Sequence, residues 1–132
     1  MRIILFIVLL SSCSIYGQQN DKISTIDFVQ ILDNNKEEAL YYYQNNWKVL
    51  RNMALKKGYI HSYQILEVPP SEVEPFHLMV ITTYLNNQQY ELREEHFTAL
   101  IKEKGALSLM NDRAPNEFRK TIFSKKTIRH WN

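Results

Sequence analysis

The chain has 132 residues, of which 45% are hydrophobic and 23% are charged, so it is large enough for one domain with an apolar core. Its formal net charge is only +2 and it has no basic block, which argues against nucleic acid as a partner. Its single cysteine, Cys13, excludes a disulfide within the chain.

The first residues, MRIILFIVLLSSCSIYGQQN, have the pattern of a secretory signal peptide. Arg2 supplies the positive charge that signal peptides carry before their apolar segment. The apolar run from Ile3 to Leu10 is far shorter than the roughly 20 residues that span a bilayer. We therefore expect an exported protein, either periplasmic or secreted.

Two processing sites compete in this leader. Gly17 precedes Gln18 and suits signal peptidase, whereas LSSC at 10–13 resembles a bacterial lipobox that would attach lipid to Cys13. We favour cleavage after Gly17, because the apolar residues at 15–16 suit a continuing signal region better than a lipoprotein tether. A membrane anchor is expected only if Cys13 is lipidated.

Removing residues 1–17 leaves 115 of the 132 residues, and we expect residues 18–132 to form a single domain. The leader contains one basic and no acidic residue, so the mature chain carries 15 Lys and Arg against 14 Asp and Glu. The mature chain would have no thiol and therefore no cysteine nucleophile or thiolate metal site.

The first half of the mature chain predicts a strand followed by a long helix. STIDFVQIL at 24–32 is rich in strand-forming residues. Asn35 and Glu38 have the spacing of a capping box, and Gly58 follows two lysines as expected at a helix end. The predicted inner stripe of this helix consists of Leu40, Tyr43, Trp47, Leu50 and Ala54.

The second half predicts two strands, a helix and a last strand. Strands at 59–68 and 76–85 flank a turn at 69–75 that contains three prolines. Asn86 and Asn87 can cap a helix that runs to Lys104, before Gly105. A loop at 106–117, with room for one helical turn, leads to a strand at 118–131. The order β-α-β-β-α-β is that of a ferredoxin-like α+β fold with a four-stranded antiparallel sheet.

Both faces of the middle strands are apolar. Met79 and Ile81 alternate with Leu78 and Val80 in one strand. Two helices cover only one face of a four-stranded sheet, and a second face exposed to solvent would carry polar residues. We therefore expect a homodimer in which two sheets pack face to face.

This pattern resembles the dimeric α+β barrel superfamily, which includes the antibiotic-biosynthesis monooxygenase-like, NIPSNAP-like and stress-responsive A/B barrel families. The stretches NWKVLRNMALKKGYIHSYQILEV and REEHF look closest to exported bacterial members whose function is not established. The resemblance implies a barrel of two sheets and a pocket between the helices and the sheet of each subunit. It does not choose a reaction, because fold alone does not determine function.

His96 in LREEHF is the best candidate for a catalytic residue. At four-residue spacing it shares a helix face with Leu92 and Leu100, at the margin of an apolar stripe. Imidazole titrates near neutrality and could carry a proton or bind a ligand there. The alternative is a histidine at the edge of the core that is hydrogen-bonded to a neighbour or to water.

Four further residues are candidates for ligand binding. Tyr43 and Trp47 lie on the inner stripe of the first helix, where aromatic residues belong to a core more often than to a ligand site. His61 and Tyr63 share one face of the second strand.

No cofactor or metal is expected. The four histidines have no metal-binding spacing, and no phosphate-binding or nucleophile-elbow motif occurs. The haem-degrading branch of the superfamily implies an asparagine on the first strand and a tryptophan on the third. This chain has Gln30 but no asparagine on its first strand, and no tryptophan on its third, so only His96 matches.

Three functions remain open. The chain could be an exported protein that binds a small apolar or aromatic molecule in a pocket between helices and sheet, which we favour. It could be a cofactor-independent oxygenase or isomerase that uses Trp47, Tyr43 and His96. It could be a structural or accessory dimer without a ligand.

Overall fold

The computed structural model describes residues 20–131. The predicted signal peptide, the two predicted processing sites and Cys13 lie outside the described residues. No helix among the described residues is both long enough and apolar enough to cross a bilayer.

Four strands form one antiparallel sheet. They are β1 (Ile23–Ile31), β2 (Ser62–Glu67), β3 (Leu78–Tyr84) and β4 (Arg119–Arg129), and they lie in the order β2-β3-β1-β4. Each pair of neighbours is antiparallel. The architecture is α+β and compatible with a ferredoxin-like fold, so the predicted fold class is confirmed at this level.

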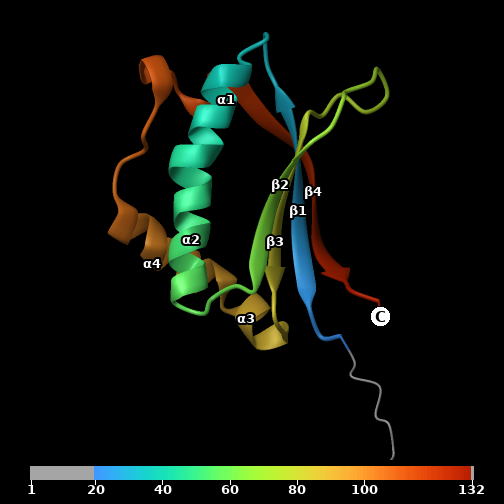
Figure 1. Cartoon of the computed structure of the whole chain (residues 1–132), viewed down its shortest axis with the longest axis vertical. Coiled ribbons are helices and arrows are strands. Elements are labelled where there is room, and N and C mark those ends of the chain that lie inside the picture. The colour runs from blue at the N-terminus through green and yellow to red at the C-terminus, as the bar shows by residue number, and fades with distance from the viewer. Residues whose placement is uncertain (1–19, 132) are drawn as a thin grey trace, which may run out of the picture.

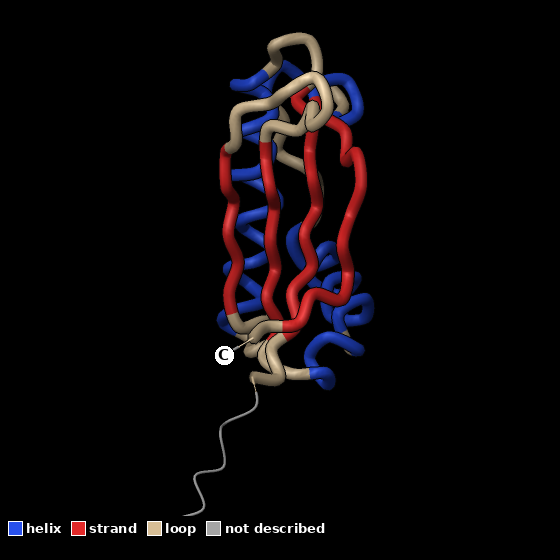
Figure 2. Tube along the Cα trace, turned by 90° about the vertical axis from the view of Figure 1, so that its right-hand side faces the viewer, coloured by secondary structure: helices blue, strands red, loops and turns tan. Residues whose placement is uncertain are grey.

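The helices cover one face of this sheet, and the other face is open (Figures 1 and 2). A long helix comprises α1 (Lys36–Tyr42), a π-helical turn η1 (Tyr43–Trp47) and α2 (Lys48–Lys56). The second helical layer is α3 (Asn87–Glu91) followed by α4 (Arg93–Lys104). A 3-10 turn η2 (Met110–Asp112) and the short helix α5 (Pro115–Phe118) lead into β4.

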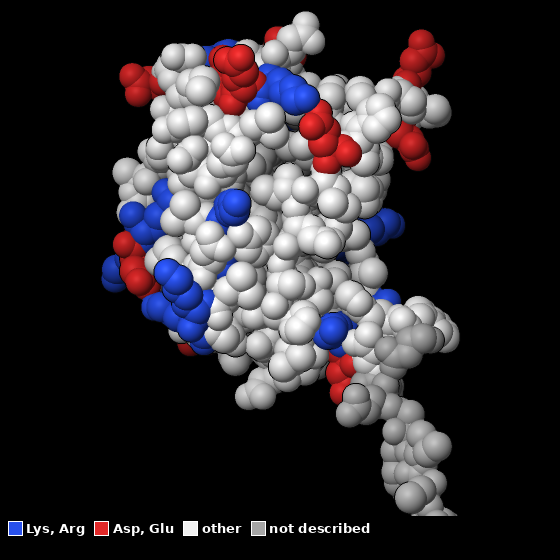
Figure 3. Space-filling view, in the orientation of Figure 1, with Lys and Arg blue, Asp and Glu red and all other residues white. Residues whose placement is uncertain are grey.

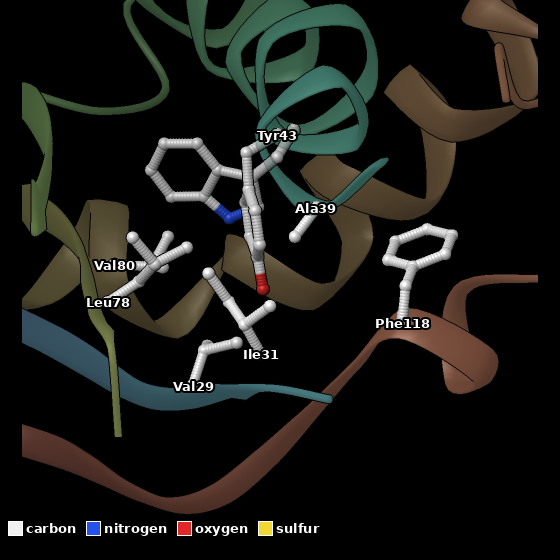
Figure 4. Packing of buried hydrophobic residues seen from close by; sticks show 8 residues of the cluster. Val29, Ile31, Ala39, Tyr43, Leu78, Val80 and Phe118 are labelled. Carbon is white, nitrogen blue, oxygen red and sulfur yellow. The ribbon is translucent and has the colours of Figure 1, made fainter. Parts of the chain in front are cut away.

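The predicted inner stripe of the long helix is confirmed. Tyr43, Trp47 and Ala54 are buried, and Leu40 and Leu50 are half-buried against the core. The larger hydrophobic cluster lies between this helix and the sheet (Figure 4). It comprises Val29, Ile31, Ala39, Tyr43, Trp47, Leu78, Val80 and Phe118. A second cluster, which includes Ile23, Ala54 and Leu100, lies at the other end of the sheet.

The predicted capping box at the start of the long helix is wrong. Asn35 is the residue before the helix, but its side chain makes no capping hydrogen bond. Instead, Asn35 Oδ1 accepts from Arg113 Nη1 at 2.6 Å, and Asn35 Nδ2 donates to the carbonyl of Leu32 at 2.8 Å. The side chain therefore joins two loops rather than satisfying the helix terminus.

The second helix begins where the sequence predicted but is interrupted once. Asn86 Oδ1 accepts from the backbone N–H of Gln89 at 2.9 Å, which confirms the predicted cap. At Leu92 the backbone leaves ideal helical geometry, with φ −82° and ψ 0°, and α4 starts after it. Gly105 ends α4 with a φ of 80°, a left-handed region that favours glycine.

The C-terminal ends of α2 and α4 meet at the surface. Lys57 Nζ donates to Glu103 Oε2 at 2.7 Å, in an exposed ion pair that joins the two ends. Lysine and arginine side chains gather in this region, at the lower left of Figure 3. An exposed pair of this kind contributes little stability, and it orients the two helices only weakly.

Strand register decides which side chains face away from the helices. Phe28 pairs with Met79, and Ile26 pairs with Ile81, whereas the buried Val29 pairs with Leu78 on the helix side. Leu66 pairs with Met79 and Phe123 pairs with Phe28, so these residues also lie on the uncovered side. We call this surface the open face. It is defined by Ile26, Phe28, Leu66, Met79, Ile81 and Phe123.

The open face is apolar at its centre and partly exposed to solvent. Gln64 and Lys125, which pair with Ile81 and Ile26, place polar groups on the same side of the sheet. Leu66 is 42% exposed and Phe123 is 43% exposed. The rings of Phe28 and Phe123 stack with their centroids 4.3 Å apart, and Phe76 packs edge-on against Phe28 at 4.9 Å. The sequence predicted two apolar sheet faces, and the register now identifies Met79 and Ile81 as the residues that point away from the helices.

Candidate functional site

A pocket of about 250 Å³ lies between the sheet and the helices α2 and α4. Three strands and both helices contribute to it, so it depends on the whole fold rather than on one loop. Its lining consists of Thr25, Asp27, Leu50, Arg51, Tyr84, Arg93, Glu94, Phe97, Ile101 and Lys126. The pocket has an apolar part and a small set of charged groups, as ligand sites commonly do.

Arg51 is held between two aromatic rings at this pocket. Its guanidinium carbon lies 4.2 Å from the centroid of Trp47 and 4.3 Å from that of Phe97. Trp47 precedes Arg51 by one helical turn, and Phe97 comes from α4. Nε of Arg51 donates to Oγ1 of the buried Thr82 at 3.2 Å. These contacts fix the plane of the guanidinium group.

Burial lowers the pKa of Arg51 to about 10, because the charged form is removed from water. The negative charge of Asp27 acts in the opposite direction but does not cancel this effect. Arg51 is therefore still a cation at neutral pH, in a place where its charge is only partly compensated.

The other charged residues of the pocket have partners of their own. Arg93 lies 4.0 Å from the ring centroid of Tyr90 and donates to the carbonyl of that residue at 2.8 Å. Its Nε is 3.6 Å from Glu94 Oε1. Asp27 Oδ1 accepts from Ser124 Oγ at 2.5 Å across the β1–β4 pair.

Three of the predicted site residues come together, two within the larger hydrophobic cluster and Tyr63 packed against it. The ring centroids of Trp47 and Tyr63 are 5.5 Å apart, and those of Tyr43 and Trp47 are 6.4 Å apart. Tyr63 donates its hydroxyl to Asn52 Oδ1 at 2.8 Å. None of the three lines the pocket, although Trp47 supports Arg51, which does.

The two predicted histidines lie apart from this group. His61 is exposed just before β2, and only its backbone N–H takes part in the sheet, donating to Thr83 at 2.8 Å. His96 stacks on Tyr59, with ring centroids 3.6 Å apart and planes inclined by 9°. The imidazole on this helix face is therefore packed flat against a tyrosine ring.

His96 Nδ1 is buried, and it has no hydrogen-bond partner among the described residues. His96 is also not part of the pocket lining, although its neighbour Phe97 is. Within residues 20–131, no group of three or more His, Cys, Asp or Glu side chains is placed to hold a metal ion.

Sequence reasoning missed Arg51 and Asn46. The four-residue spacing from Trp47 to Arg51 was the available signal, because it places a cation on the inner stripe. Asn46 lies in the π-helical turn, is 1% exposed, and makes four hydrogen bonds. Asn46 follows the polar residues Gln44 and Asn45, so the local sequence gives no sign that it is buried or has such partners.

No family model, no curated protein and no solved structure matches the chain. The resemblance to dimeric α+β barrels stays a prediction. What the structure shows is the coarser architecture, a four-stranded antiparallel sheet with helices on one face.

Alkaline pH should destabilise the fold through Tyr43. Burial raises the pKa of this phenol well above its ordinary value of about 10, and Arg119 offsets only part of the effect. Above pH 10 the unfolded chain loses the proton while the folded chain keeps it, so the free energy of unfolding falls as pH rises. Tyr43→Phe should flatten this fall in urea titrations at pH 9–11. Tyr84, whose pKa burial also raises, adds to the fall, whereas Arg51, whose pKa burial lowers to about 10, opposes it. An unchanged pH profile in Tyr43→Phe would contradict the assignment.

Proposed function

We propose that this protein binds a small molecule with an apolar or aromatic body in the pocket between α2, α4 and the sheet. The observation that carries the proposal is the pocket itself, which has a mixed lining drawn from five elements. Leu50, Phe97 and Ile101 offer apolar surface, and Tyr84 adds a ring that is only 3% exposed. About eight water volumes of ~30 Å³ would fill such a space, which suits a single-ring molecule rather than a peptide.

We favour binding over the oxygenase or isomerase alternative. A reaction in this pocket needs a group that moves a proton, and the titratable carboxylates in the lining are Asp27 and Glu94. Asp27 already accepts a hydrogen bond from Ser124, and the side chain of Glu94 is 86% exposed. His96, the expected proton carrier, faces Tyr59 instead.

We further propose that two copies of the chain pack through their open faces, as in a dimeric α+β barrel, and that the protein is exported. The apolar character of the open face supports the dimer, because fully burying each large side chain gains about 1.5–3 kcal/mol. Two facing four-stranded sheets offer an area on the order of the 2,000 Å² that obligate dimers bury. The leader-like sequence of residues 1–17 supports export.

Blocking the pocket tests the binding proposal. Ile101 is 55% exposed and lines the pocket, so Ile101→Trp should fill part of the space without disturbing the core. The probe is 4-fluorophenylacetamide, a neutral single-ring molecule whose binding is followed by fluorine NMR. We expect Ile101→Trp to weaken binding at least about tenfold, since the indole would occupy space that the ring of the probe needs and the probe would lose its apolar contacts there.

The matched control is Leu107→Trp. Leu107 is 50% exposed and lies outside the pocket lining, so this change adds the same side chain elsewhere. The control should bind the probe as the unmodified protein does. Equal binding by both variants would overturn the proposed pocket, and native mass spectrometry of protein purified from the periplasm should in parallel show a retained small molecule.

A further inference from the structure

We propose that Arg51 anchors a carboxylate group of the ligand, so that the pocket takes a small monoanion with an apolar or aromatic body. The inference rests on the proposed function, because it names the chemistry of the molecule that the same pocket would bind. It follows from how Arg51 is held, from the charge balance around it and from the size of the pocket.

The guanidinium group of Arg51 is fixed but not saturated. Trp47 and Phe97 cover its two faces, and Nε is engaged by Thr82. Neither terminal amino group donates a hydrogen bond to another residue of the part of the chain that the structure describes. An arginine has five N–H donors, so four remain available on these two nitrogens. N–H groups held in this planar arrangement can donate two parallel hydrogen bonds to the two oxygens of a carboxylate.

The charges of the lining favour an anion with a single charge. Arg93 and Glu94 form a neutral pair at the rim. The remaining charged residues of the lining are the cations Arg51 and Lys126 and the carboxylate of Asp27. Their sum is one uncompensated positive charge. A monoanion neutralises the pocket, whereas a phosphate dianion would leave it negative. The loss of solvation that lowers the pKa of Arg51 also means that the cation gains more from a bound anion here than at the surface.

The apolar part of the pocket decides what the carboxylate is attached to. Phe97 stacks on Arg51 and also lines the pocket, so a ring or short alkyl chain bound through its carboxylate would lie against Phe97 and Leu50. The volume of about 250 Å³ leaves room for one ring and its acid group. The ligand class is therefore a small aromatic or aliphatic monocarboxylic acid.

The test compares two probes that differ only in charge. 4-Fluorophenylacetate carries a carboxylate, and 4-fluorophenylacetamide is its neutral counterpart of the same shape. We expect the unmodified protein to bind the carboxylate about tenfold to a hundredfold more tightly at pH 7 and low salt, because two charge-assisted hydrogen bonds form in a partly dry site. Inorganic phosphate should not displace it at equal concentration.

Arg51→Gln should remove this preference, so that both probes bind with similar affinity. The matched control is Arg129→Gln, which removes one positive charge from an exposed position outside the pocket lining and should keep the preference. Lys126→Gln provides a second variant, because Lys126 is exposed and lines the pocket without stacking. It should reduce the preference by a smaller factor, about twofold to threefold. If Arg51→Gln fails to fold, the Lys126 variant and the two-probe comparison in the unmodified protein decide the matter.

Two outcomes would overturn the inference, and they differ in what else they affect. Equal binding of both probes by the unmodified protein, with Ile101→Trp still blocking both, would show a binding pocket in which Arg51 only bridges α2 and α4. The proposed function would then stand without the carboxylate. Binding of neither probe by the unmodified protein at millimolar concentration would overturn both proposals.

Discussion

Met79→Lys or Ile81→Lys should convert the proposed dimer into monomers, because each substitution places a charge on the sheet face that the helices do not cover. Both side chains lie on the open face in β3, one of the two middle strands of the sheet. In a twofold arrangement each substitution introduces two buried charges, one per copy, and neither has a partner. We expect the dissociation constant to rise at least about a hundredfold, since breaking a well-packed interface core costs several kcal/mol.

Analytical ultracentrifugation at micromolar concentration is the measurement, and the unmodified protein comes first. It should sediment as a dimer. Two controls separate an interface effect from a loss of stability. Thr121→Lys places the same charge on an exposed position that pairs with Val29 on the helix side, so it should leave the dimer intact. Val80→Lys should unfold the subunit, because Val80 is 3% exposed within the core. A well-folded monomer of the unmodified protein would refute the barrel arrangement.

Asn46→Ala should destabilise the subunit by about 3–5 kcal/mol, since it leaves several buried polar groups without partners. Asn46 Nδ2 donates to the carbonyls of Tyr42 and Ser108 at 3.1 and 2.7 Å. Asn46 Oδ1 accepts from the Ser108 N–H at 2.8 Å and from Lys104 Nζ at 2.9 Å. One side chain thus fastens the loop after α4 to the π-helical turn.

Asn45→Ala is the matched control, because it removes the same side chain one position earlier. Asn45 is half-buried and makes one hydrogen bond, from Nδ2 to the carbonyl of Tyr41 at 2.9 Å. Its loss should cost about 1 kcal/mol or less. Urea unfolding of both variants measures the difference. Similar midpoints for the two variants would show that the loop after α4 stays in place without Asn46.

The sequence predicted the elements well where local pattern decides them. The helix stripe from Leu40 to Ala54 repeats at helical spacing, and Asn86 has a cap acceptor directly before its helix, so neighbouring residues suffice. The capping box at Asn35 had the same local support and failed. Its side chain is held by Arg113, 78 positions further along the chain, and no local pattern indicates that contact.

The candidate site was less predictable for the same physical reason. Their aromatic character makes Tyr43, Trp47 and Tyr63 candidates for ligand binding. In the structure Tyr43 and Trp47 belong to the larger hydrophobic cluster, and Tyr63 packs against it. Arg51 reaches the pocket only because Phe97 and Thr82 come to it from two other elements. Sequence spacing places a residue on a helix face, but it does not show which residues from distant segments meet that face.

The π-helical turn Tyr43–Trp47 also bears on how this chain relates to others of similar architecture. A π-type hydrogen bond spans five residues instead of four, so the turn accommodates one residue more than regular α-helix does. Deleting one residue between 43 and 47 would let α1 and α2 join as a continuous helix with both flanks in their present orientation. In a chain without that extra residue, Arg51 would still lie at the pocket, but the π-helical turn that positions the Asn46 side chain would be absent. A homologous chain that lacks this π-helical turn should therefore align on either side of it with a one-residue gap inside residues 43–47.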